Sequence, residues 1–213
     1  MEIVKVLKKI WHFIWDDDSI WSWLANIVLA FVLIKYIVYP GLGFMLMTDY
    51  PIVAVVSNSM HHEQSFDMWW DNAKGWYESN NINKDLFETF PMKGGFNKGD
   101  IMILAGVNPK TVKVGDIIVF QSGKPDPIIH RIVKKTEEGD KMYYQTKGDN
   151  YITNPTPIQT NGIDETRIPH DLKIVKGKAI LRIPFLGYVK IMALRTICFF
   201  DSYGYCPAEY QTI

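Results

Sequence analysis

An apolar run spanning residues 20–38 constrains this 213-residue chain more than any other feature of its sequence. Only Ser22, Asn26 and Lys35 interrupt the run, and a helix needs about 20 apolar residues to cross the hydrocarbon core of a bilayer. Trp and Tyr residues lie at both ends of the run, as is typical of a membrane–water interface. We therefore predict a transmembrane anchor over residues 20–39.

Two other interpretations of this run are less consistent with the residues around it. A cleavable targeting peptide would have a shorter apolar region followed by a small-residue cleavage motif, whereas Tyr-Pro-Gly-Leu follows here. A buried core helix is disfavoured by the length of the run. Pro40 and the glycines at positions 41 and 43 are expected to end the helix.

Basic residues before the run indicate its orientation in the membrane. Lys5, Lys8 and Lys9 precede it, and lysines near a span favour the cytoplasmic side. Apolar residues recur at helical spacing within residues 1–14, which predicts an amphipathic helix on the inner leaflet. We expect residues 1–19 to be cytoplasmic and the remainder to be extracytoplasmic, in a single-pass protein of the cell membrane.

The pattern after the anchor is typical of β-strands. Short β-branched or aromatic runs alternate with Gly, Pro, Asn and Asp, and long helices do not alternate with them. This predicts a mainly antiparallel β domain over residues 48–190. The expected strands are Ile52–Val56, Ile101–Leu104, Asp116–Phe120, Ile128–Val133, Lys141–Thr146 and Lys178–Ile183.

An aromatic-rich insertion at residues 61–97 interrupts this pattern. Phe66, Trp69, Trp70 and Ala73 fall at helical spacing, and the Ser-Phe-Asp sequence at 65–67 can begin a helix. We therefore expect the insertion to be partly helical. Its rings either cap the β core or lie in the lipid interface beside the anchor.

Composition excludes several classes of function. Basic and acidic residues number 23 each, so net charge does not predict a nucleic-acid partner. The sequence contains no glycine-rich phosphate loop, and its two cysteines lack the spacing of a zinc site. A single bridge between Cys198 and Cys206 is compatible with an extracytoplasmic location. These cysteines belong to a C-terminal tail, residues 191–213. The apolar stretch 188–200 is expected to be either an amphipathic helix on the membrane or a core-packing helix, and the chain from Cys206 onward a loose terminus.

Three residue types suited to acyl transfer lie on separate segments. Ser59 follows an apolar run, His130 lies within another, and Asp149 belongs to a Lys-Gly-Asp-Asn sequence. A serine hydroxyl needs a base within hydrogen-bond reach, and a carboxylate fixes the tautomer of a histidine base. The competing interpretations are a turn serine, a core histidine and a turn-bracing aspartate.

Several motifs in one order resemble type I signal peptidases of the archaeal and endoplasmic-reticulum kind. The resemblance runs from the anchor to about Ile191 and leaves the insertion and the tail outside it. Each motif is weak by itself, but the series is specific. The motifs are Ser57-Asn58-Ser59-Met60, Lys98-Gly99-Asp100-Ile101, Gly115–Phe120, His130-Arg131-Ile132, Thr146–Asn150, Gly177-Lys178-Ala179 and Ile183–Tyr188.

The resemblance implies a role for each matching residue. Ser59, directly before methionine, matches the family's nucleophile. Ser57, two positions earlier, matches a donor that helps to hold the oxyanion together with the Ser59 amide. His130 occupies the strand that carries a lysine base in the bacterial branch, which is consistent with the serine–histidine branch.

The third member of the site stays open between two aspartates. Asp149 matches one family aspartate, but the second one usually found a few residues later is missing from residues 151–155. The next carboxylates are Asp164 and Glu165, and an insertion that displaces the second aspartate to Asp164 would explain the pattern. Both Asp149 and Asp164 are therefore candidates.

The resemblance implies a membrane-anchored serine endopeptidase that removes signal peptides from secreted preproteins without metal or organic cofactor. One alternative is a membrane-tethered β domain that binds extended peptides without cleaving them. Another is a serine–lysine dyad using Lys134 or Lys135, although these lysines look like a solvated hairpin end. His61 and His62 are expected to be exposed loop residues. The sequence does not indicate whether accessory subunits are needed.

Overall fold

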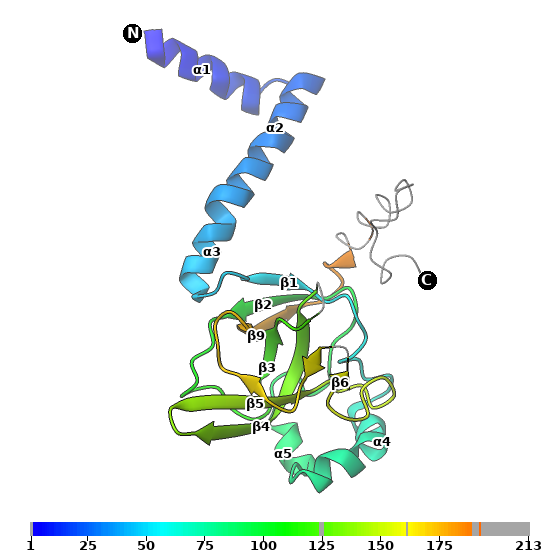
Figure 1. The fold of residues 1–213 in the computed structure, drawn as a ribbon. Helices are drawn as coiled ribbons and strands as arrows, with labels where there is room; N and C mark the ends of the chain where they lie inside the picture. Colours follow the sequence, from blue (N-terminus) through cyan, green and yellow to red (C-terminus); the bar gives the residue numbers. More distant parts are fainter. Residues whose placement is uncertain (1, 124–125, 161, 189–191, 193–213) are drawn as a thin grey trace. The chain divides into compact units, whose positions relative to one another are not determined.

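The computed structural model describes residues 2–123, 126–160, 162–188 and 192 (Figure 1). The chain divides into two compact units, Met1–Met45 and Leu46–Ile213. The predicted tail, apart from residue 192, and the cysteine pair lie outside the described residues.

The N-terminal unit begins with two helices joined by a short turn. Helix α1 covers Glu2–Trp15 and helix α2 covers Ile20–Leu33. Ser22 Oγ donates a hydrogen bond to the Phe13 carbonyl at 2.5 Å, and Asn26 Nδ2 donates one to the Ile14 carbonyl at 2.9 Å. The last carbonyls of a helix lack partners within it. Two of the polar residues that interrupt the apolar run therefore satisfy the end of α1.

The apolar helix continues past Pro40, contrary to our expectation that it would end there. A π-helical turn, η1 at Ile34–Val38, connects α2 to α3 at Tyr39–Leu46. The Tyr39 N–H donates to the Ile34 carbonyl, five residues back. A proline has no N–H to donate and clashes with the turn before it, and the wider π turn accommodates it. The continuous helix, Ile20–Leu46, has 27 residues and a mean hydropathy of 2.0, enough by length and composition to cross a membrane.

The described residues of the second unit form a seven-stranded antiparallel sheet in the order β1-β2-β9-β3-β4-β5-β8, which confirms the predicted mainly β fold. A separate two-stranded ribbon pairs β6 with β7. The strands are β1 (Ile52–Ala54), β2 (Ile101–Ala105), β3 (Ile117–Phe120), β4 (Ile128–Glu138), β5 (Lys141–Lys147), β6 (Gln159–Thr160), β7 (Ile163–Asp164), β8 (Ile168–Pro169) and β9 (Val175–Ile183).

Strand β3 is buried on both faces and divides the core. Its residues Ile117 and Val119 belong to one apolar cluster, whereas Ile118 and Phe120 belong to another. Successive side chains of a strand point to opposite faces of the sheet. Both faces of the sheet are therefore packed at this point, which explains why all four residues of β3 are apolar.

The insertion forms a third cluster in which its rings pack on one another. It contains helices α4 (Phe66–Ser79) and α5 (Lys84–Glu88) (Figure 1). Trp69, Trp70 and Tyr77 of α4 are buried against Phe87 of α5 and Val133 of β4. The helical spacing is confirmed, and the rings cap the core. The interfacial alternative is wrong for these four buried rings, whereas Phe66 and Trp76 are only half-buried and for them it stays a prediction.

The ends of β1 and β5 meet although four strands separate them in the sheet. Asn150, which follows β5, donates its backbone N–H to the carbonyl of Ser59, which follows β1, at 2.9 Å. Neighbouring strands lie about 4.8 Å apart, so this contact requires the sheet to curl (Figure 1). The curl brings distant parts of the sequence to one site.

Candidate active site

The serine segment, Ser57–Met60, is held by contacts at Asn58 and Met60, while its two serine side chains are exposed or half-buried. Ser57 is exposed and Ser59 is half-buried, and their hydroxyl oxygens lie 3.1 Å apart. Met60 is buried in the core, and its sulfur accepts the Asp149 N–H at 3.3 Å. Asn150 Nδ2 also donates to the Asn58 carbonyl at 3.1 Å. The loop can therefore present its hydroxyls to solvent while its backbone stays fixed.

His130 is buried in β4 and pairs with a buried glutamate. Its Nδ1 is hydrogen-bonded to Glu165 Oε1. Thr146 Oγ1 donates to the same carboxylate oxygen at 2.8 Å, and the Ile158 N–H donates to Glu165 Oε2 at 2.7 Å. Both carboxylate oxygens thus have partners. A carboxylate on Nδ1 leaves Nε2 of a neutral imidazole free to act as a base.

Gly148 is the point where the serine segment and the histidine meet. A Cβ added there would lie 2.6 Å from the Ser59 carbonyl oxygen and 2.9 Å from His130 Nε2. Contacts this short are essentially never seen for a real Cβ, so only glycine fits between them. The Ser59 backbone carbonyl and His130 Nε2 therefore both lie against Gly148, while His130 Nδ1 binds Glu165.

Asp149 binds Arg131 rather than His130. The Arg131 guanidinium donates to both carboxylate oxygens, with Nη2 at 2.6 Å from Oδ2 and Nε at 3.0 Å from Oδ1. Burial alone would raise the pKa of Asp149, but Arg131, and then His62, hold it well below its usual range. The bracing role that we weighed for Asp149 matches this geometry better than a partnership with the imidazole.

Asp164 does not contact His130 either, and this corrects its expected position. Its side chain is exposed and accepts bonds from the Thr166 hydroxyl at 2.6 Å and the Thr166 N–H at 3.0 Å. The Thr166 hydroxyl lowers the pKa of Asp164. Adjacent residues of an extended chain point to opposite sides, so the next carboxylate, Glu165, faces inward. The carboxylate that binds His130 is therefore one residue further along the chain than Asp164.

The lysines near the site do not form a dyad with Ser59 in the part of the chain that the structure describes. Lys134 is exposed and lies four residues along β4 from His130, roughly 13 Å at the rise of a strand. Lys135 Nζ donates to the carbonyls of Pro109 and Val112.

Lys147 is a buried cation that sequence reasoning did not single out. Burial lowers its pKa to about 8, against the opposing effect of Asp149. Its Nζ donates to the Gly148 carbonyl at 2.8 Å and lies 4.8 Å from the centre of the Tyr77 ring. The motif Lys-Gly-Asp-Asn gave a signal for this position, but no pattern in the sequence indicates that its lysine is buried.

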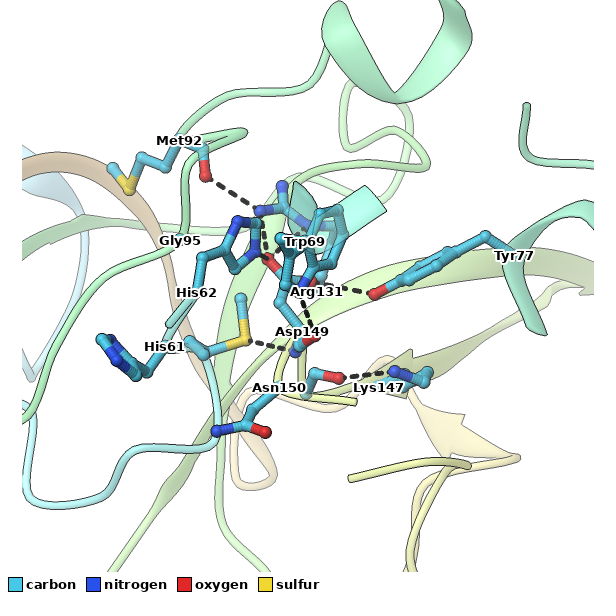
Figure 2. A network of polar contacts seen from close by, with 12 residues as sticks. His61, His62, Trp69, Tyr77, Met92, Gly95, Arg131, Lys147, Asp149 and Asn150 are labelled. Carbon is cyan, nitrogen blue, oxygen red and sulfur yellow. Dashed lines mark hydrogen bonds and ion pairs between the residues drawn. The ribbon is translucent and has the colours of Figure 1, made fainter. Parts of the chain in front are cut away.

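The two histidines that follow Met60 point in different directions, as expected, but they are not both exposed (Figure 2). His61 Nδ1 lies 2.5 Å from Asn97 Oδ1 and is half-buried. His62 is buried, stacks on Trp69 with ring centres 3.7 Å apart, and places Nε2 3.5 Å from Asp149 Oδ2. The prediction that His62 is exposed was wrong because the insertion covers it.

Comparison with known proteins confirms the resemblance that the motifs predicted. No protein-family model matches the chain. It is 36% identical over 103 residues to the signal peptidase complex catalytic subunit SEC11 of Metarhizium acridum, and 37% identical over 103 residues to that of Pyricularia oryzae. Both matches cover 47% of this chain and 58% of the relative.

A third relative extends the match slightly. The signal peptidase complex catalytic subunit SEC11 of Candida albicans is 33% identical over 115 residues, which is 53% of this chain and 65% of the relative. The chain thus spans between about half and two thirds of the length of these relatives.

Proposed function

We propose that this chain is a membrane-anchored serine endopeptidase that removes signal peptides from secreted preproteins. The observation that carries the proposal is the position of His130, whose Nδ1 binds a buried glutamate while Nε2 lies beside Gly148 and the Ser59 segment. Similarity to catalytic subunits of signal peptidase complexes supports the same activity and substrate class.

In the proposed reaction, Ser59 Oγ attacks the scissile carbonyl carbon while His130 Nε2 takes the hydroxyl proton. Glu165 stabilises the resulting imidazolium. The hydroxyl of Ser59 now hydrogen-bonds that of Ser57, so attack requires Ser59 to turn toward His130. The hydrogen bond between a nucleophile and its base is often long in a free enzyme and shortens when substrate binds.

The tetrahedral intermediate carries a negative oxygen that needs donors. The Ser57 hydroxyl and the Ser59 backbone amide are the proposed donors, and each is worth about 3 kcal/mol of barrier height. Collapse of the intermediate expels the amine, which receives the proton from His130, and leaves an ester on Ser59. Water, activated by the same imidazole, then hydrolyses the ester and restores the hydroxyl.

We assign the preprotein to the edge of β1 that pairs with no other strand among the described residues. This strand ends the sheet, and the chain runs from it directly into Ser57 and Ser59. An extended peptide can add to such an edge through main-chain hydrogen bonds. The small side chains that signal peptidases accept before the scissile bond would then alternate along it.

We place residues 1–19 in the cytoplasm, the helix from Ile20 in the bilayer of the cell membrane, and residues 48–190 outside as the peptidase domain. The length and hydropathy of Ile20–Leu46 support the anchor. Helix α1 supports an interfacial position, because its basic residues share one face and its apolar residues are exposed. The relatives are named as subunits of a complex, so accessory subunits belong to the proposal.

The test is cleavage of a model preprotein by the purified full-length chain in liposomes. The wild type should release the signal peptide, and Ser59→Ala should lower the rate by at least a thousandfold. Asn58→Ala, next to the nucleophile, controls for damage to the loop and should retain most of the activity. Cleavage that persists in Ser59→Ala would come from a contaminant, and would favour the non-catalytic peptide-binding alternative.

A further inference from the structure

Helix α4 of the insertion donates two hydrogen bonds to one residue of the site. Trp69 Nε1 donates to the Asp149 backbone carbonyl at 3.0 Å, and the Tyr77 hydroxyl donates to Asp149 Oδ1 at 3.2 Å. Figure 2 shows Trp69, Tyr77 and Arg131 arranged around Asp149. Trp69 and Tyr77 lie eight positions apart, so they share one face of α4, and both are buried.

Helix α4 also packs on Lys147, the residue before Gly148. The ammonium of Lys147 lies 4.8 Å from the centre of the Tyr77 ring and 5.3 Å from that of Trp76. Cations are attracted to the faces of aromatic rings. α4 therefore contacts the chain on both sides of Gly148, at Lys147 and at Asp149.

The neighbours of Asp149 are the residues that hold the serine and the histidine. Gly148 lies against the Ser59 carbonyl and His130 Nε2. Asn150 donates its backbone N–H to the Ser59 carbonyl at 2.9 Å. A shift of the Asp149 peptide unit would move both neighbours, because the peptide bonds that join them are planar and stiff.

We propose that α4 is a positioning element of the active site, in which Trp69 and Tyr77 hold Asp149 and thereby keep Gly148 and Asn150 against Ser59 and His130. The inference rests on the proposed function and assigns a role to the insertion, which lies outside the resemblance to signal peptidases. Arg131 anchors the Asp149 carboxylate from β4. The insertion adds the second anchor, and Trp69 provides the bond to the backbone.

The test compares two tyrosine-to-phenylalanine variants of the full chain in liposomes. Tyr77→Phe removes the hydroxyl on Asp149 and keeps the ring. Tyr144→Phe is the matched control, because Tyr144 is also buried but its hydroxyl partner is His170, at 3.0 Å. Tyr77→Phe should lower kcat about tenfold with an unchanged KM, since a misplacement near 1 Å can cost about a hundredfold. Tyr144→Phe should leave kcat unchanged.

A second readout does not depend on activity. Amide hydrogen exchange at Asn150 reports the bond from its N–H to Ser59. We expect faster exchange at Asn150 in Tyr77→Phe and in Trp69→Phe than in the wild type, and no change in Tyr144→Phe.

The two readouts separate the inference from the proposed function. Wild-type exchange and wild-type kcat in Tyr77→Phe would overturn the positioning role while the endopeptidase assignment stands. A wild-type chain that does not cleave the preprotein, but shows the faster Asn150 exchange in Tyr77→Phe, would overturn the endopeptidase assignment while α4 still positions the loop. Equal losses of kcat in Tyr77→Phe and Tyr144→Phe would reduce the effect to general destabilisation and overturn the positioning role.

Discussion

The choice between two adjacent acids shows what a single residue decides in this site. Asp164 and Glu165 differ by one position, yet the first is exposed and the second is fully buried against His130. Motif matching pointed to Asp164, the residue beside the one that contacts His130, and could not assign the side that each residue faces. That depends on β7, a strand of two residues whose pattern is too short to read from sequence.

Glu165 is expected to control the basicity and tautomer of His130. Replacing it by Gln keeps the shape but removes the charge, so we predict a fall in kcat of about a thousandfold or more, as in triads whose acid is made an amide. Asp164→Asn should change kcat less than twofold, because its carboxylate bonds Thr166 and Gln159 rather than His130. The measurement is steady-state cleavage of a model preprotein. The opposite order of effects would return the role to Asp164.

Gly148 leaves no room for a side chain. We predict that Gly148→Ala lowers cleavage by at least about a hundredfold, because its methyl group would separate the Ser59 backbone from His130 by the kind of shift that costs this much. Gly94→Ala is the control, since a Cβ there meets nothing within 4 Å. Retention of wild-type activity in Gly148→Ala would show that Ser59 and His130 need not be this close.

Lys147 is expected to make the free energy of unfolding rise with pH. Burial lowers the pKa of Lys147 to about 8 from 10.5, so the unfolded chain binds the proton more tightly. Between those values the unfolded state carries more protons than the folded one, and stability rises with pH. Burying the charged ammonium lowers the free energy of unfolding by about 3 kcal/mol at most, given the difference between the two pKa values. This loss is complete below pH 8 and fades as the pH rises toward 10.5.

Lys147→Met isolates that dependence from the other groups that titrate in the same range. We predict that the free energy of unfolding of the wild type gains on that of the variant as pH rises from 8 to 10.5, measured by denaturant titration. A difference between the two proteins that stays constant with pH would mean that Lys147 keeps its ordinary pKa when folded.

At the scale of elements, strands with strong apolar runs were predicted well and irregular helices were not. The run at Ile101–Leu104 became β2 with one residue added, whereas the run at Ile128–Val133 became the start of β4, which continues five residues further to Glu138. The helix end at Pro40 was wrong because the π turn at Ile34–Val38 has no sequence signature that distinguishes it from an ordinary turn.

The two helices of the insertion should form a stable unit with a defined centre. Phe87 is fully buried, and its ring packs on Trp69, Trp70 and Tyr77. Phe87→Ala should lower the free energy of unfolding by about 3–5 kcal/mol, the usual cost of such a cavity. Leu86→Ala, its exposed neighbour, should cost less than about 1 kcal/mol. Thermal and denaturant unfolding would check both, and similar losses would contradict the packing described for this cluster.

At the scale of the whole molecule, the sequence predicted an apolar anchor followed by a β domain, and it ordered the motifs along the chain. It could not predict that the segment after β1 meets the segment after β5, because this contact depends on the strand order and on the curl of the sheet. It could not predict either that the insertion packs on Asp149, because the hydrogen bonds from Trp69 and Tyr77 to Asp149 join residues 80 and 72 positions apart.

The central claim is that His130, oriented by Glu165, is the base that activates Ser59. Its most direct test is the initial rate of preprotein cleavage in liposomes by His130→Ala and by Lys134→Ala, each compared with the wild type. We predict that the initial rate of His130→Ala is lower than that of the wild type by about a thousandfold or more, while the rate of Lys134→Ala stays within about twofold of the wild type. Activity that survives in His130→Ala and disappears in Lys134→Ala would rule out His130 as the base and favour a serine–lysine dyad.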